Sequence, residues 1–98
     1  MNIEKERHDD KLTLTLTGRL DTNTASELEH VIQESDAEIK TLMLDLAGLD
    51  YISSAGLRVI LTAQKKMLKQ GSMKLRNLTE SVREVFDMTG FSTILDIE

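Results

Sequence analysis

The sequence of 98 residues contains no cysteine and no proline, and it has only five glycines. Without cysteine the chain can form neither a disulfide nor a thiolate site, so we expect a protein of the reducing cytoplasm. No apolar run approaches the roughly 20 residues that span a bilayer, and the start, MNIEKERHDDK, lacks the apolar segment of a secretory signal. Because nothing resembles a flexible linker or an internal repeat, we expect a single domain over residues 1–98 that does not enter a membrane.

Basic surface is also scarce. The formal net charge is −5 at pH 7, whereas a protein that binds nucleic acid needs cations to neutralise phosphates. Lysines do gather in QKKMLKQGSMKLR, residues 64–76, and we interpret them as the solvated face of a helix. With 40% apolar and 30% charged residues, the composition indicates a globular protein, and we expect no binding to nucleic acid.

Two periodicities define the first half of the chain. Residues 11–17, KLTLTLT, alternate between leucine and threonine, which predicts a half-buried strand; residues 2–8 before it suit a weak edge strand that ends in the turn at Asp9 and Asp10. A helical stripe of apolar residues follows over about residues 24–33. Thr24, with Glu27 three residues later, matches a capping box and predicts where this helix begins.

The second half alternates between strands and helices. The apolar run of residues 42–46 predicts a strand covered on both faces, and a second helix runs from near Ser54 to a terminating glycine, Gly71. A strand over residues 72–78, a helix that ends at Gly90, and a last short strand over residues 92–97 complete the series. This order predicts an α/β fold with a mixed sheet and helices packed on one face.

The residues give little support to an enzyme. A nucleophilic serine needs a nearby base, and the two histidines, His8 and His30, both suit exposed polar positions. No group of side chains has metal-ligand spacing, and no glycine-rich phosphate loop is present. Asp45 and Asp50 flank apolar segments and suit strand ends or turns. We therefore expect no catalytic residues, no metal site and no cofactor.

The most informative segment is LDYISSAGLRVIL, residues 49–61, in which two serines, Ala55 and Gly56 precede a predicted helix. Ser53 or Ser54 is suited to be the N-cap of that helix. A cap alone does not explain two serines followed by two small residues, which would also leave a hydroxyl uncovered. A phosphate on that hydroxyl would add about −1.5 to −2 charges at a helix N-terminus, where an anion is favoured.

Three segments together closely resemble the STAS-domain anti-sigma factor antagonists of bacteria. They are GRLDTNTASEL, LMLDLAGLDYISSAGLRVIL and GSMKLRNLTESVREVFDMTGF, and the resemblance runs over residues 12–97. It implies a STAS fold, with a mixed four- to five-stranded sheet and helices packed on one face.

The resemblance also implies a function by partner switching. The unphosphorylated antagonist would bind an anti-sigma factor that is also a serine kinase of the GHKL type, and would thereby release the sigma factor. Phosphorylation would break the complex, and a PP2C-type phosphatase would reverse it. The matching serine is Ser54; because the family commonly has Asp-Ser where this chain has two serines, Ser53 is the alternative acceptor. A module that controls another target, such as a secretion or motility regulator, is the alternative function.

The resemblance further implies a partner-binding surface, and because nothing in the sequence demands more than a monomer, we expect a monomer. Matching positions before the first helix are Gly18, Leu20, Asp21, Thr22 and Asn23, and those at the second helix are Ser53, Ala55, Gly56, Arg58 and Thr62. Leu57 fits the core stripe better than this surface.

Overall fold

The computed structural model describes residues 1–35 and 37–98. The strands are β1 (Asn2–His8), β2 (Lys11–Leu20), β3 (Thr41–Ile52) and β4 (Ser72–Arg76); the helices are α1 (Thr22–Glu34), α2 (Ser54–Leu68) and α3 (Glu80–Thr89), followed by a short 3-10 helix, η1 (Phe91–Thr93). The strands form one sheet in the order β1-β2-β3-β4. β1 runs antiparallel to β2, whereas β2, β3 and β4 are parallel. The predicted α/β fold with a mixed sheet is confirmed, with four strands.

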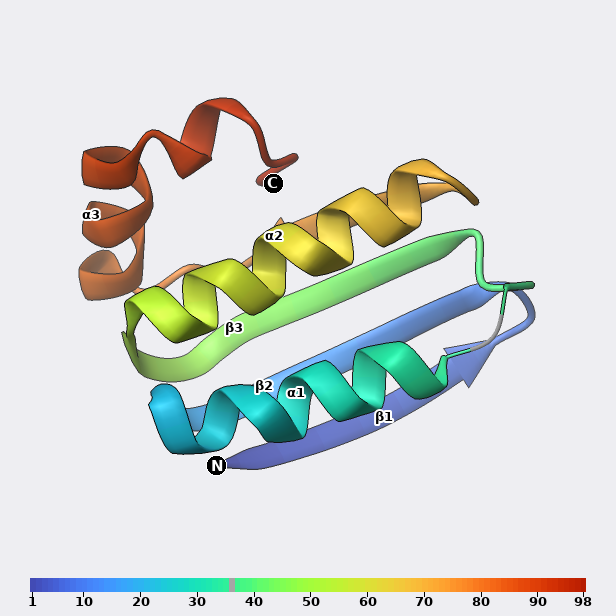
Figure 1. Ribbon diagram of the computed structural model, residues 1–98, viewed down its shortest axis with the longest axis horizontal. Helices are drawn as coiled ribbons and strands as arrows, with labels where there is room; N and C mark the ends of the chain where they lie inside the picture. The colour runs from blue at the N-terminus through green and yellow to red at the C-terminus, as the bar shows by residue number, and fades with distance from the viewer. Residues whose placement is uncertain (36) are drawn as a thin grey trace.

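The helices cover one face of this sheet (Figure 1). In β2 the alternating leucines point towards them: Leu12 is 7% exposed, and Leu14 and Leu16 are fully buried. α1 contributes Leu28 and Ile32 to the same core, and α2 and α3 add the other buried helical side chains. The core thus forms between the alternating leucines of β2 and the apolar stripes of the helices, as the sequence predicted. Among the described residues, no helix is both long and apolar enough to cross a bilayer.

The opposite face of the sheet is not covered by any described helix, so the prediction that residues 42–46 have a covering layer on both faces is wrong, although most of these side chains are buried. Met43 points to this face and is still only 3% exposed. It lies in register between Thr13 and Lys74 of the neighbouring strands, whose side chains flank it on the same face. Neighbouring strands, rather than a second layer of helices, remove this methionine from water.

The end of the chain differs from the prediction of a fifth strand over residues 92–97. η1 occupies the first part of that segment, and only an isolated parallel bridge joins Ile97 to Leu75. The amide of Leu75 donates to the carbonyl of Asp96 at 2.9 Å, and the amide of Glu98 donates to the carbonyl of Leu75 at 2.8 Å. The last residues therefore cover part of the β4 edge without forming a regular strand.

The two predicted helix-terminating glycines have different roles. Gly90 follows α3 with a φ of 80°, the left-handed conformation expected of a C-terminal glycine. Gly71 lies beyond the end of α2 and is needed for space, because a Cβ there would lie 1.9 Å from the carbonyl oxygen of Lys40. The amide of Ser72 donates to that oxygen at 2.8 Å, which starts β4 beside β3.

A lysine on α2 joins the two long helices. Lys66 Nζ donates to the carbonyl oxygens of Ile32 and Ser35 at 2.7 and 3.0 Å and to the Ser35 hydroxyl at 3.1 Å. These oxygens lie at the C-terminus of α1, where the helix dipole favours a cation. Lys66 therefore satisfies the free carbonyls of α1 and fixes α1 against α2.

We predict that Lys66→Met lowers the free energy of unfolding by about 1–2 kcal/mol, because it leaves the carbonyls at the end of α1 without their charged donor. Urea denaturation of the variant and the wild type gives this difference. Lys65→Met is the matched control, since Lys65 is exposed on the same helix, and it should change stability by less than about 0.5 kcal/mol. Equal losses in the two variants would contradict the assigned role of Lys66.

Candidate functional site

Three loops meet at one edge of the sheet. Because β2, β3 and β4 are parallel, their carboxyl ends lie at the same edge, and each strand is followed by a helix. Figure 1 shows the first turns of α1, α2 and α3 at this edge. The amide of Ser53 donates to the carbonyl of Leu20 at 2.8 Å and ties the first two loops together. In open α/β sheets ligands and partners commonly bind at this edge, so it is the candidate site.

The two serines have different surroundings. Ser53 is the N-cap of α2, and its hydroxyl oxygen accepts from the amide of Gly56 at 3.2 Å. Ser54 is the first residue of the helix and is exposed. Its hydroxyl makes no hydrogen bond within residues 1–35 and 37–98. One serine is thus used by the helix, and the next displays its hydroxyl to solvent.

The loop before α1 is closed by a different cap from the one predicted. α1 begins at Thr22, and its N-cap is Asp21, which accepts from the amides of Asn23 and Thr24 at 3.0 Å each. The Thr24 hydroxyl accepts from the amide of Asp21 at 2.9 Å, so the predicted box of Thr24 with Glu27 is wrong. The bond from the Thr24 amide is the main cause that lowers the pKa of Asp21 below its ordinary value. The cap is therefore charged at neutral pH.

The small residues after Ser54 let α2 begin close to the sheet. Gly56 is buried, and a Cβ at this position would lie 2.7 Å from Leu20 Cγ and 3.0 Å from Ile52 Cγ1. Leu20 itself is fully buried. Among the predicted partner-binding residues, Leu20 and Gly56 therefore fill the interior beneath the site, while the half-buried Ala55 lies at its border.

The other predicted partner-binding residues differ in their exposure. Thr22, Asn23, Arg58 and Thr62 are exposed, whereas Gly18 and Asp21 are half-buried. Gly18 has a φ of 109°, which a residue with a side chain rarely adopts. The Thr62 hydroxyl donates to the carbonyl of Arg58 at 3.0 Å. Leu57 is 7% exposed and belongs to the core, as predicted. Contact of these residues with a partner stays a prediction.

Sequence reasoning missed a cation–π pair that includes Tyr51, close in sequence to the two serines. The guanidinium of Arg19 lies over the ring of Tyr51, 4.1 Å from its centroid, and the two residues are in register on β2 and β3. Tyr51 is 40% exposed, one of few large apolar side chains that reach the surface among the described residues. No spacing rule joins residues on separate strands, so only the register of β2 on β3 reveals the pair.

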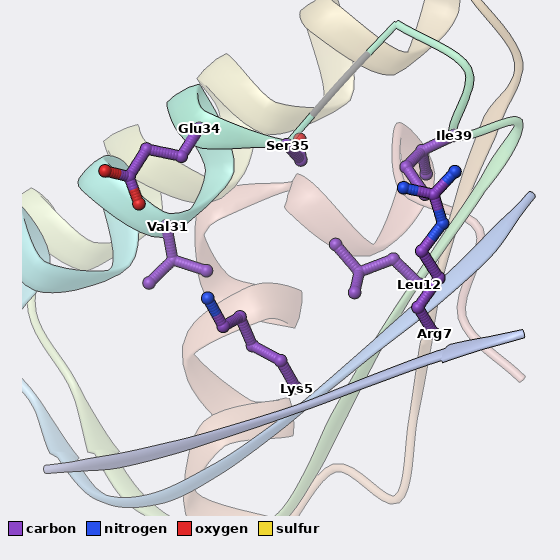
Figure 2. A pocket seen from close by; sticks show the side chains of 7 residues that line it. All are labelled: Lys5, Arg7, Leu12, Val31, Glu34, Ser35 and Ile39. Carbon is purple, nitrogen blue, oxygen red and sulfur yellow. The ribbon is translucent and has the colours of Figure 1, made fainter.

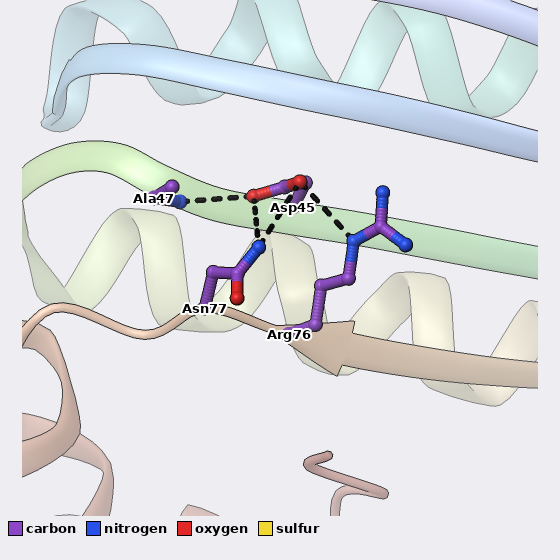
Figure 3. Close-up of polar contacts among 4 residues, drawn as sticks. All are labelled: Asp45, Ala47, Arg76 and Asn77. Atoms are coloured by element: carbon purple, nitrogen blue, oxygen red, sulfur yellow. Dashed lines mark hydrogen bonds and ion pairs between the residues drawn. The ribbon is translucent and has the colours of Figure 1, made fainter.

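The third loop is held by Asp45, which the sequence placed at a strand end. Asp45 instead lies within β3, and its carboxylate accepts from the amide of Ala47, from Arg76 Nε at 3.1 Å and from Asn77 Nδ2 (Figure 3). Asn77 has a φ of 59°, so this contact holds a strained corner directly after β4. Thr79 continues the attachment, because its hydroxyl donates to the carbonyl of Leu49 at 2.8 Å.

No catalytic arrangement surrounds the serines in the described part of the chain. His8 contacts Glu6 at 3.2 Å, and His30 contacts Glu34 at 3.0 Å. Both histidines are largely exposed, and neither contacts the serine pair. Among residues 1–35 and 37–98, no group of three or more acidic, histidine or cysteine side chains is arranged to hold a metal ion. What this edge presents to solvent is the exposed Ser54 at the first position of α2.

Known proteins share this sequence and fold. A family model described as the STAS domain matches residues 2–98. BtrV of Bordetella bronchiseptica is 37% identical over 99 residues, a match that covers 99% of this chain and 85% of that protein. The anti-sigma-B factor antagonist of Bacillus subtilis is 30% identical over 98 residues, a match that covers 99% of this chain and 90% of that protein.

Solved structures show the same fold at lower identity. The protein TM1081 of Thermotoga maritima superposes with a TM-score of 0.89 at 21% identity, covering 97% of this chain and 84% of that one. The Bacillus cell fate determinant SpoIIAA, solved in its phosphorylated form, superposes with a TM-score of 0.78 at 18% identity, covering 99% of this chain and 91% of that one.

We predict that Gly56→Ala lowers the free energy of unfolding by about 1–3 kcal/mol, because the added methyl group overlaps Leu20. Urea denaturation of this variant, of Leu20→Ala and of the double variant forms a mutant cycle. The double variant should lose clearly less than the sum of the single losses, since removing the Leu20 side chain makes room for the methyl group. Additive losses would show that the two residues do not interact.

We predict that Asp45→Asn both destabilises the protein and flattens its pH dependence. Burial raises the pKa of Asp45. Hydrogen bonds from Ala47, Asn77 and Arg76 lower the pKa by more than burial raises it, so the pKa lies below its ordinary value of 3.8. The stabilisation is complete above the ordinary value and is lost as pH falls through the folded one. At pH 7 the variant should lose about 2 kcal/mol.

Urea denaturation at a series of pH values tests this prediction. The difference in unfolding free energy between wild type and Asp45→Asn should shrink as the pH falls from about 5 to 3, because the wild-type carboxylate takes up a proton. The remaining carboxylates are common to both proteins and cancel in the difference. A difference that stays constant over this range would contradict the assigned contacts.

Proposed function

The chain belongs to the STAS-domain family, and from this membership we propose that it is an anti-sigma factor antagonist switched by phosphorylation of Ser54. In its unphosphorylated form the antagonist binds an anti-sigma factor, and the sigma factor that the anti-sigma factor had bound is released. Addition of phosphate to Ser54 ends the binding. The similarity to the anti-sigma-B factor antagonist of Bacillus subtilis supports the first step, and SpoIIAA, which shares this fold and was solved in a phosphorylated form, supports phosphate as the modification in the second.

The observation that carries the choice of Ser54 is the difference between the two hydroxyls. The Ser53 oxygen accepts from the Gly56 amide and caps the helix, so its modification would disturb the start of α2. Ser54 is exposed at the first position of that helix, where a kinase reaches the hydroxyl without unfolding the chain. Ser54 is therefore the proposed acceptor, and Ser53 keeps α2 in place.

The surroundings of Ser54 suit a phosphate that changes a surface and leaves the fold intact. The phosphate would carry about −1.5 to −2 charges at neutral pH. It would lie at the positive end of α2, where free amides favour an anion, and the first turn of α2 contains no acidic residue that would repel it. The expected effect is loss of partner binding through charge and bulk at the interface.

The proposed partner surface surrounds this serine. It comprises the exposed Thr22 and Asn23 before α1, Ser54 itself, and Arg58 and Thr62 on α2. Asp21, Gly18, Ser53 and Ala55 support it at its border, and Leu20 and Gly56 support it from beneath. Arg19 and Tyr51 extend it towards the open face of the sheet, since arginine and tyrosine are frequent energetic centres of interfaces.

The proposed partners are a cytoplasmic anti-sigma factor with serine kinase activity of the GHKL type, and a PP2C-type phosphatase. The kinase binds ATP and catalyses the phosphate transfer, so the antagonist itself needs no catalytic group. It acts as a monomer that is both the substrate and the ligand of the kinase.

We predict that incubation with ATP and the GHKL-type kinase encoded nearest its gene adds one phosphate to Ser54. Intact-mass spectrometry with site mapping measures this. Ser54→Ala should remain unmodified and keep the stability of the wild type, because its hydroxyl has no partner in the described chain. Ser53→Ala should still accept phosphate on Ser54 but lose about 1 kcal/mol of stability with its cap.

The outcomes separate the parts of the proposal. Stable kinase binding without phosphate transfer would overturn the switch, and phosphate on Ser53 would overturn the choice of acceptor. In a transcription assay with the kinase and its sigma factor, the unphosphorylated protein should restore transcription and the phosphorylated one should not. A kinase complex that leaves transcription unchanged would favour the alternative target, a regulator of secretion or motility.

A further inference from the structure

A pocket lies between the edge strand β1 and the C-terminal half of α1, away from the serine site. Its volume is about 270 Å³, and it is lined by Lys5, Arg7, Leu12, Val31, Glu34, Ser35 and Ile39. Figure 2 shows Lys5 rising from β1 towards Val31 of α1, and Arg7 rising from the same strand towards Ile39, with Leu12 between the two cationic side chains. The pocket thus combines an apolar interior with two cationic side chains at its β1 wall.

The pocket exists because α1 packs on β2 and α2 and leaves part of β1 uncovered. Lys5 and Arg7 are in register with Leu14 and Leu12, so they point to the helix side of the sheet. Apolar residues there would fill the space beneath α1. Long charged side chains keep their ends in water and leave the buried Leu12 and Ile39 as the floor of a hollow.

The charges that face the pocket favour an anion. Lys5 makes no hydrogen bond or ion pair within the described residues, and Arg7 is oriented by a bond from its Nε to the carbonyl of Asp9 at 2.9 Å. On the opposite wall, Glu34 is in contact with His30 at 3.0 Å. Lys66 binds the carbonyl and hydroxyl of Ser35, which offsets the negative end of α1. Among the described residues that line the pocket, two are cationic and one is anionic, and Lys5 is the cation that no hydrogen bond or ion pair occupies.

We propose that this pocket binds a small organic anion, a carboxylate on a short apolar body. The carboxylate lies at the ammonium group of Lys5, and the apolar body covers Leu12, Val31 and Ile39. The volume is near the lower end of the roughly 300–1,000 Å³ typical of ligand pockets, which restricts the ligand to a short chain or a single ring.

This site is separate from the proposed phosphorylation switch. α1 has 13 residues, so at about 1.5 Å per residue its two ends lie about 20 Å apart. The Asp21 cap lies at one end, and the pocket walls Glu34 and Ser35 lie at the other. Ligand binding here does not require that the switch exist, so each proposal can fail without the other.

The test is an NMR titration of the full chain with octanoate, kept below its micelle concentration. Octanoate should shift the amide resonances of Lys5, Arg7, Val31 and Ser35 in a saturable manner, and octylamine, of the same chain length and opposite charge, should not. Lys5→Met keeps an apolar side chain and removes the charge, and Lys5→Glu reverses it; we expect binding to weaken in that order, by about tenfold or more for the reversal.

Two further variants make the test specific. Lys65→Glu changes the net charge equally on the exposed face of α2 and should bind octanoate like the wild type. Val31→Phe should block binding by filling the pocket. Equal binding of octanoate and octylamine, or unchanged affinity in Lys5→Glu, would show that the lysine stem only covers apolar surface and would overturn the proposal. Absence of saturable shifts in the wild type would overturn it as well.

Discussion

The close approach of α2 to the end of β2 is the constraint on which the site depends. Gly56 lies against Leu20 with no room for a methyl group, and the Ser53 amide binds the Leu20 carbonyl. This contact fixes the start of α2 at a buried leucine and forces the first residue of the helix outwards. The exposure of Ser54 is therefore a consequence of how tightly its neighbours are packed.

The same edge is held at each of its three loops by a polar side chain that binds backbone. Asp21 closes the loop before α1, Ser53 closes the one before α2, and Thr79 holds the one before α3 through the carbonyl of Leu49. A surface built in this way loses little conformational entropy when a partner binds. It also keeps its shape when one exposed hydroxyl is modified, so that a modification changes recognition alone.

The sequence was most informative where one periodicity or one local motif decides the structure. The leucine alternation of β2 placed its buried face correctly, and the serines with their small neighbours located the start of α2. Prediction from the sequence failed where the burial or the contacts of a side chain depend on residues distant in the chain. Met43 is buried by adjacent strands, Asp45 finds Arg76 and Asn77 across the sheet, and Arg19 meets Tyr51 only through strand register. Local spacing carries no information on such contacts.

The uncovered edge strand β1 also keeps its charges apart by face. Lys5 and Arg7 point to the helix side, whereas Glu4 and Glu6 are in register with Thr15 and Thr13 on the open side. If two copies paired through antiparallel β1 strands, the helix sides of both copies would lie on the same face of the joined sheet. The basic residues of one copy would then lie opposite the basic residues of the other, and glutamate opposite glutamate, which is destabilising. An open edge strand can template aggregation. The alternation of basic and acidic residues along β1 disfavours its pairing with the β1 strand of a second copy.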